Sequence, residues 1–153
     1  MKSRMNIFQV APDAIKGMVA VETAVGKSGL EHGLLELVRL RASQINGCGY
    51  CIYMHVKDAL KQGEADMRLH LLSAWRESPL FTARERAALN WTETLTRVAD
   101  TGAPDDDYEQ LKEYFNETEI AYLTVLIGAI NVWNRVQIGL GAIHPVEDTK
   151  AAA

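Results

Sequence analysis

The chain has 153 residues, of which 48% are hydrophobic and 24% charged, a composition that fits one globular domain with a sizeable core and excludes a disordered chain. Its formal net charge of −4 argues against a nucleic-acid partner, which would require a basic surface. The positive residues Lys2 and Arg4 are not followed by a long apolar run, so we expect no signal peptide and predict a cytoplasmic protein.

Apolar residues recur at helical spacing along the chain, and no stretch of the sequence shows the alternation typical of a strand. Residues that stop helices interrupt the pattern, for example at Asn46-Gly47 and at Gly63. The predicted helices cover residues 13–26, 30–45, 48–62, 65–75, 83–99, 105–115 and 118–140, and a tail follows over 141–153. We therefore predict an all-α single helical domain over residues 1–153, without repeats or linkers.

Two of the predicted helix starts carry specific signals. Thr82 and Glu85 have the spacing of a capping box, in which each side chain accepts a hydrogen bond from the other residue's backbone. Pro104 suits the first turn of a helix, and the acidic residues after it suit the positive end of the helix dipole.

The last predicted helix, residues 118–140, is apolar on most of its faces. Such a helix is central to a core or buried in a subunit interface, so we predict a homo-oligomer. Its most apolar segment, residues 120–133, is too short to span a bilayer, and we expect no membrane partner. Asn131, Asn134 and Arg135 need polar partners on this helix, and we expect interface or capping hydrogen bonds for them.

The only two cysteines, Cys48 and Cys51, lie three residues apart, and His55 follows four residues after the second. On a helix, at roughly 100° per residue, these three side chains fall within a stripe about 60° wide. Helical side chains lean toward the N-terminus, so His55 leans back toward the thiols. A thiol in the first helical turn feels the positive end of the dipole, which favours thiolate. In a reducing compartment this pattern indicates a dithiol redox centre.

Other uses of the two cysteines are less favoured. A structural disulfide would close a very small loop and constrain little of the unfolded chain. A zinc ion is the main rival, with Cys48, Cys51 and His55 as ligands and Glu36 as a fourth, but no second cysteine pair closes such a site. Covalent haem is excluded because Ile52, not histidine, follows Cys51. We predict no metal and no organic cofactor.

Glu36 joins the same site if the chain reverses at Asn46-Gly47. It would then lie about 16 Å back from the turn and His55 about 12 Å, at 1.5 Å rise per residue, nearly level across an antiparallel helix pair. A carboxylate that orients an imidazole, which in turn handles a thiol proton, forms a base relay. The alternative is that Glu36 is an exposed charge on a helix face.

This spacing, from Glu36 through Cys48-x-x-Cys51 to His55, resembles the active-site motif of the AhpD-like alkylhydroperoxidases, within the carboxymuconolactone decarboxylase family. The resemblance is strongest over residues 34–63 and extends to 81–89 and 130–135. It implies an all-helical fold, a homo-oligomer (often a trimer or hexamer) and a thiol peroxidase that reduces small hydroperoxides.

The resemblance also implies residue roles. Cys51 would be the peroxidatic cysteine, Cys48 the resolving cysteine, and His55 with Glu36 the proton relay. Some members carry a second histidine just before the second cysteine, where this chain has Tyr50, which makes Tyr50 a further candidate site residue. A dithiol reductant, thioredoxin-like or lipoyl-type, would reduce the disulfide by exchange.

Two other functions stay open. A decarboxylase of this family would handle a polyanionic lactone without using thiols, and it would need converging arginine or lysine side chains near a cavity. A disulfide-exchange or redox-sensing module would use the same dithiol without peroxide turnover.

Overall fold

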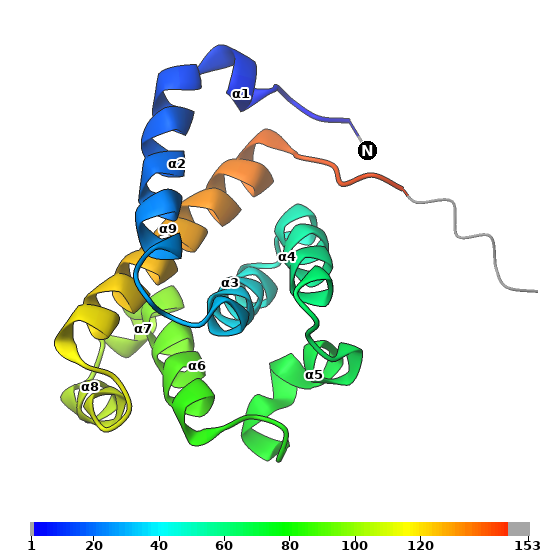
Figure 1. The fold of residues 1–153 in the computed structure, drawn as a ribbon. Helices are drawn as coiled ribbons and strands as arrows, with labels where there is room; N and C mark the ends of the chain where they lie inside the picture. The colour runs from blue at the N-terminus through cyan, green and yellow to red at the C-terminus, as the bar shows by residue number, and fades with distance from the viewer. Residues whose placement is uncertain (1, 147–153) are drawn as a thin grey trace, which may run out of the picture.

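The computed structural model describes residues 2–146, and all regular secondary structure in that part of the chain is helical (Figure 1). The all-α prediction is confirmed, whereas the predicted tail is described only as far as residue 146, and its remainder, 147–153, lies outside the described residues. The elements are α1 (Ile7–Val10), α2 (Pro12–Gly26), α3 (His32–Asn46), α4 (Gly49–Lys61), α5 (Asp66–Leu71), the 3₁₀ helix η1 (Leu72–Glu77), α6 (Ala83–Thr96), α7 (Val98–Thr101), α8 (Asp105–Lys112) and α9 (Glu117–Leu140).

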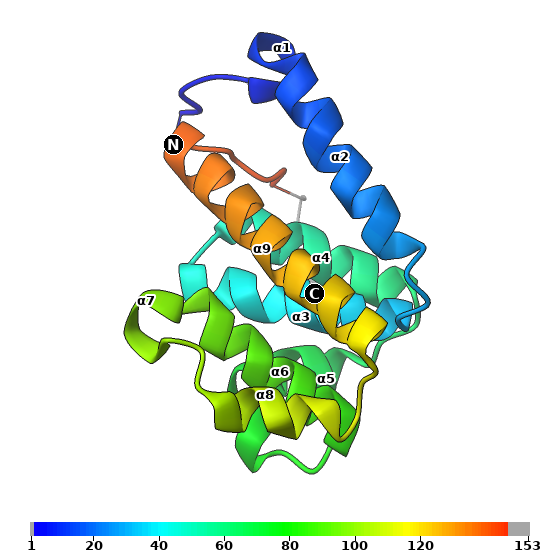
Figure 2. The same ribbon diagram turned by 90° about the vertical axis from the view of Figure 1, so that its left-hand side faces the viewer.

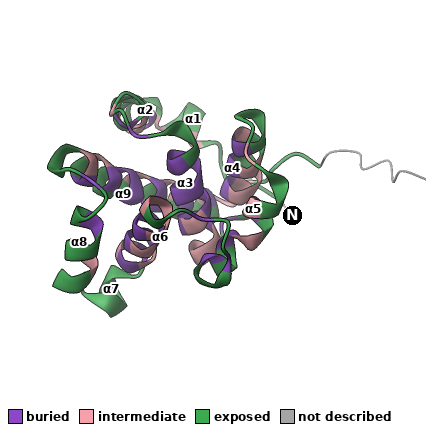
Figure 3. Cartoon of the chain, turned by 60° about the horizontal axis from the view of Figure 1, so that its bottom comes forward, coloured by how far each residue is buried: buried purple, intermediate pink, exposed green. Residues whose placement is uncertain are grey.

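Helix α3 lies at the centre of the described fold, with α4, α6 and α9 packed around it (Figures 1 and 2). One side of α3 contributes Leu34, Leu35 and Val38 to a cluster shared with α6, α8 and α9. Leu37 and Leu40 instead join a second cluster with α4, α5, η1 and α6. Buried residues accordingly gather on α3 and on the faces turned toward it, whereas α1 and α7 are exposed (Figure 3). This central position buries most of α3, including the charged residue Glu36.

The turn between α3 and α4 forms as its residues predict. Gly47 takes a left-handed conformation, with φ 69°, and ends α3. The backbone N–H of Cys48 donates to the carbonyl of Ser43 at 3.0 Å, which closes the last turn of α3. The capping box of Thr82 and Glu85 is also present, with both of its hydrogen bonds.

Several helix boundaries differ from the prediction. Helix α1 was not predicted, because four residues are too few to show a period. The helix predicted over 65–75 changes to a 3₁₀ helix at Leu72, and Ala74 leaves the helical region with φ −113°. The helix predicted over 83–99 ends at Thr96, because Arg97 leaves the helical region with φ −110°, and the separate helix α7 begins at Val98.

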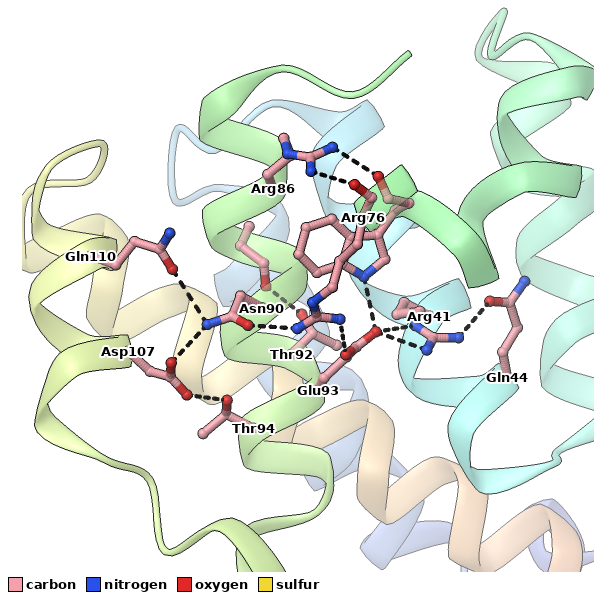
Figure 4. A network of polar contacts seen from close by, with 12 residues as sticks. Arg41, Gln44, Arg76, Arg86, Asn90, Thr92, Glu93, Thr94, Asp107 and Gln110 are labelled. Carbon is pink, nitrogen blue, oxygen red and sulfur yellow. Dashed lines mark hydrogen bonds and ion pairs between the residues drawn. The ribbon is translucent and has the colours of Figure 1, made fainter. Parts of the chain in front are cut away.

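A polar network fixes η1 against α3 and α6 (Figure 4). The partly buried carboxylate of Glu93 accepts hydrogen bonds from Arg41 Nε at 2.8 Å and Trp75 Nε1 at 2.9 Å, and it also pairs with Arg76. Burial alone would raise the pKa of Glu93, but the hydrogen bonds from Trp75, Arg76 and Arg41 outweigh it and lower the pKa. Glu93 is therefore a charged hub that joins three elements.

Helix α9 is long and apolar enough, by length and composition alone, to cross a membrane. The prediction that this part of the chain is too short to span a bilayer considered only residues 120–133 and is wrong for the 24-residue helix. In the fold, α9 packs against α2, α3 and α6, as the core helix of a globular domain does. Helix α2 lies along α9 and buries only Ile15 and Val25 (Figure 2).

Candidate active site

The two cysteines lie where α4 begins. Cys48 is the N-cap residue of α4, not its first helical residue, and its Sγ accepts a hydrogen bond from the backbone N–H of Cys51 at 3.3 Å. A disulfide joins the two residues, whose Cα atoms are 5.3 Å apart, and both are 1% exposed. The pair therefore lies against the positive end of the α4 dipole.

The structure brings Glu36 and His55 together across the α3–α4 pair. His55 Nδ1 lies 2.9 Å from Glu36 Oε2, and the two residues are 6% and 7% exposed. The alternative of an exposed Glu36 is thus wrong. The estimate made from the Asn46-Gly47 turn agrees with the structure, because α3 ends at Gly47 and α4 packs back against α3.

Three further residues extend this pair. Arg39 donates from Nη1 to Glu36 Oε1 at 2.7 Å and from Nη2 to Glu22 Oε2 at 2.8 Å. Trp133 Nε1 donates to the other oxygen of Glu22 at 3.2 Å. Arg39 could have been found from its position three residues after Glu36 on one helix. Glu22 and Trp133 come from α2 and α9, and no local pattern connects those helices to the site.

The charge on Glu36 sets the tautomer of His55. Burial by itself would raise the pKa of the Glu36 carboxyl, but His55 and Arg39, through their hydrogen bonds and charges, outweigh it and leave the pKa below its ordinary value of 4.5. An ionised carboxylate can only accept a hydrogen bond, so Nδ1 of His55 carries the proton. In the neutral imidazole, Nε2 is then a free base, and it is buried without a hydrogen-bond partner among the described residues.

A pocket of about 340 Å³ opens beside these groups. Its polar lining comes from α2, α3, α4 and α9, namely Glu22, Glu36, Arg39, Tyr50, Cys51, His55, Asp58 and Gln137. Its apolar lining consists of Phe8, Val19, Met54, Ile130 and Trp133. The ring of Phe8 stacks on that of Trp133, with centroids 6.4 Å apart. Cys51 lines this pocket and Cys48 does not, so a small molecule in the pocket reaches Cys51 first.

The polar residues of α9 hold the turn that carries the cysteines. Asn46 Nδ2 donates to Asn131 Oδ1 at 3.0 Å and to Asn134 Oδ1 at 2.9 Å, and Asn134 Nδ2 donates to Ser43 Oγ at 3.0 Å. Arg135 Nη1 donates to the backbone and side-chain oxygens of Asn131. These side chains find partners inside the chain, in place of the interface or capping bonds expected from the sequence.

One group of potential metal ligands adjoins the pocket. Ligand atoms of Glu36, His55 and Asp58 lie within 4.8 Å of one another. A cation there would compete with Arg39, which already neutralises Glu36. The zinc site considered from the sequence used both sulfurs, and in this disulfide form they are bonded to each other.

Comparisons with known proteins agree with this architecture. The sequence model of the carboxymuconolactone decarboxylase family matches residues 12–94. The uncharacterised protein YdfG of Bacillus subtilis (strain 168) is 36% identical over 141 residues, which cover 92% of this chain and 96% of YdfG.

Solved structures of other proteins share this fold. A protein of unknown function from Agrobacterium tumefaciens, for which a role as the antioxidant defence protein AhpD has been suggested, superposes with a TM-score of 0.93 at 48% identity, covering 95% of this chain and 100% of that one. An uncharacterised peroxidase-related protein with an alkylhydroperoxidase AhpD core, from Ralstonia eutropha JMP134, shares the fold with a TM-score of 0.80 at 19% identity, over 92% of this chain and 74% of that one. The chain therefore belongs to the carboxymuconolactone decarboxylase family and has the AhpD-like fold.

Proposed function

We propose that this protein is a thiol-dependent peroxidase that reduces small hydroperoxides through a Cys48/Cys51 dithiol–disulfide cycle. The observation that carries the proposal is the shared pocket of Cys51 and His55, in which the free base Nε2 has no other partner among the described residues. A thiol and a base that both line a pocket can activate a nucleophile for a small electrophile.

The first half of the cycle begins from the reduced protein. His55 Nε2 accepts the proton of the Cys51 thiol, and the thiolate attacks the terminal oxygen of the hydroperoxide. The O–O bond breaks, and the leaving alkoxide takes a proton from His55 to give an alcohol, or water when the substrate is hydrogen peroxide. Cys51 is left as a sulfenic acid. Glu36 holds His55 in the required tautomer, and the hydroxyl of Tyr50, which lines the pocket, helps to hold the peroxide.

The second half forms and then reduces the disulfide. Cys48 attacks the Cys51 sulfur, the S–O bond breaks, and water leaves. The N-cap position of Cys48 suits this step, because the backbone N–H of Cys51 points at its sulfur and stabilises thiolate. A dithiol reductant, thioredoxin-like or lipoyl-type, restores both thiols by exchange in the cytoplasm.

The charges of the pocket favour this function over a decarboxylase. A polyanionic lactone would need free cationic groups, yet the only arginine among the residues that line the pocket, Arg39, is held by both Glu22 and Glu36. A disulfide-exchange module would need no small-molecule pocket at Cys51, and the presence of one favours a peroxidase.

The test is peroxide consumption by the full chain with dithiothreitol as reductant. Wild type should turn over repeatedly, and Cys51→Ser should show no enzymatic turnover. Cys48→Ser, reduced beforehand and freed of dithiothreitol, should reduce one equivalent of peroxide and stop as a sulfenic acid. Disulfide exchange by wild type without any peroxide consumption would contradict the proposal and identify an exchange module.

A further inference from the structure

Among the three carboxylates that line the pocket, Asp58 is the one that makes no hydrogen bond or ion pair with the other described residues of the site. Cys51, His55 and Asp58 occupy positions i, i+4 and i+7 of α4. All three therefore share one helical stripe, and all three line the pocket. A carboxylate oxygen of Asp58 lies within 4.8 Å of ligand atoms of both His55 and Glu36. Within residues 2–146, its side chain has no hydrogen bond and no ion pair, and it is half-buried.

The other charges of the lining are already paired. The Arg39 guanidinium bonds Glu36 through Nη1 at 2.7 Å and Glu22 through Nη2 at 2.8 Å, so both of its terminal nitrogens are bonded to other carboxylates. Three carboxylates against one guanidinium leave the lining with an excess of two negative charges when His55 is neutral. Asp58 is the member of this set that is not offset by a bonded cation.

The position of Asp58 brings no stabilisation from its own helix. It lies in the last turn of α4, which ends at Lys61, where the dipole disfavours a negative charge. Its physical effect is therefore the negative potential that it places on the pocket beside the reacting groups.

We propose that Asp58 is a specificity-determining residue, which makes the pocket accept uncharged hydroperoxides and reject those that carry a negative charge. The identity of the substrate as a peroxide rests on the proposed function, but the charge selection applies to any reagent that approaches Cys51 through this pocket. The apolar lining of Val19, Met54 and Ile130 suits a hydrocarbon body. An esterified fatty-acyl hydroperoxide should therefore react faster than the corresponding free acid.

The size of the effect follows from Coulomb's law. For unit charges roughly 7–10 Å apart, with an effective dielectric between those of a protein surface and water, repulsion by Asp58 should slow an anion roughly threefold to thirtyfold. High salt should reduce that factor, because the pocket is open to solvent.

Iodoacetamide and iodoacetate provide a matched pair of probes, since they are similar in size, attack the same thiolate and differ in charge. The rate constants for alkylation of Cys51 are measured by mass spectrometry in a Cys48→Ser background, which leaves one thiol. The ratio of the amide rate to the acetate rate cancels any change in the thiolate fraction. We expect Asp58→Asn to lower this ratio threefold to thirtyfold, and Asp58→Lys to lower it further. Asp66→Asn is the control, because this exposed aspartate lies on α5 and does not line the pocket.

An unchanged ratio in both Asp58 variants, or an equal change in Asp66→Asn, would overturn the proposal. The alkylation assay needs no peroxide turnover. An inactive peroxidase with a shifted ratio would thus reject only the proposed function, whereas an active peroxidase with an unshifted ratio would reject only the role of Asp58.

Discussion

The contact between Glu36 and His55 leaves Nε2 as the free nitrogen of the imidazole, the atom that takes the proton of Cys51 in the proposed cycle. Glu36→Gln keeps the shape of the side chain but removes the charge that holds the proton on Nδ1. We expect alkylation of Cys51 by iodoacetamide at neutral pH to slow by about 10²–10⁴-fold, the usual loss when a general base is disabled. The rate should recover partly at high pH, where the thiol ionises unaided.

Glu113→Gln is the matched control for that substitution, because Glu113 is exposed and does not line the pocket. A wild-type rate for Glu36→Gln across the whole pH range would show that the buried contact does not serve proton transfer.

The lowered pKa of Glu36 also predicts a pH dependence of stability. A carboxyl whose pKa is lower in the folded state stabilises the fold at pH values above its unfolded pKa, and this stabilisation is lost as the pH falls through the folded pKa. As the pH falls below about 4.5, the ordinary pKa of the carboxyl, the difference in unfolding free energy between wild type and Glu36→Gln should therefore shift against wild type. Urea denaturation at a series of pH values measures it, and a difference that does not vary with pH would contradict the assigned shift.

The part of the site that could be predicted from sequence lies within one helical hairpin. Helical spacing predicts that Cys51 and His55 share one stripe. For Glu36, spacing offered a position level with His55 across the turn at Gly47 and left an exposed charge as the alternative, which the structure excludes. The same helical spacing could have identified Asp58, which lies three residues after His55 on the stripe that carries Cys51. Glu22 could not be found in this way, since its contact with Arg39 joins residues of α2 and α3 through tertiary packing.

The polar network around Glu93, which joins η1, α3 and α6, leads to a prediction about the stability of the fold. Glu93→Ala leaves Arg41 and the Trp75 N–H without their shared carboxylate in a largely buried site. Removing one partner of such a group should cost roughly 2–4 kcal/mol of unfolding free energy. Glu113→Ala, an exposed position, should cost less than about 0.5 kcal/mol. Urea denaturation compares the two, and equal losses would mean that the network contributes no particular stability.

The ends of helices could be predicted from the sequence where a capping side chain or a glycine determines them, and were predicted less accurately where packing determines them. The Thr82–Glu85 box and the left-handed Gly47 are local devices, and both occur where expected. No glycine or proline between Asp66 and Ser78 marks the change from α5 to the 3₁₀ helix. Leu72 and Trp75 of that 3₁₀ helix are buried in the core instead. Packing of that kind is a property of the assembled fold.

For the whole molecule, we propose a homo-oligomer, a trimer or hexamer. Besides its core face, α9 leaves Val125, Val132 and Ile138 each nearly half exposed, an arrangement that favours coverage by another subunit. Light scattering at micromolar concentration should give three or six times the 17.0 kDa of the chain. Val125→Asp with Val132→Asp should lower that mass, whereas Met67→Asp, at an exposed methionine of α5, should not. A monomer mass for wild type would refute the oligomer.

Helix α2 is held to the rest of the fold by few buried side chains, which affects how often it opens. Only Ile15 and Val25 of its 15 residues are buried, yet the α1–α2 segment supplies Phe8, Val19 and Glu22 to the pocket wall. Segments with few buried apolar contacts open locally at a small fraction of the global unfolding free energy. Amide hydrogens of α2 should therefore exchange with solvent faster than those of α3, and an apolar ligand that fills the pocket should slow the exchange in α2. By the same linkage, how tightly the pocket holds a ligand depends on how often this wall is open.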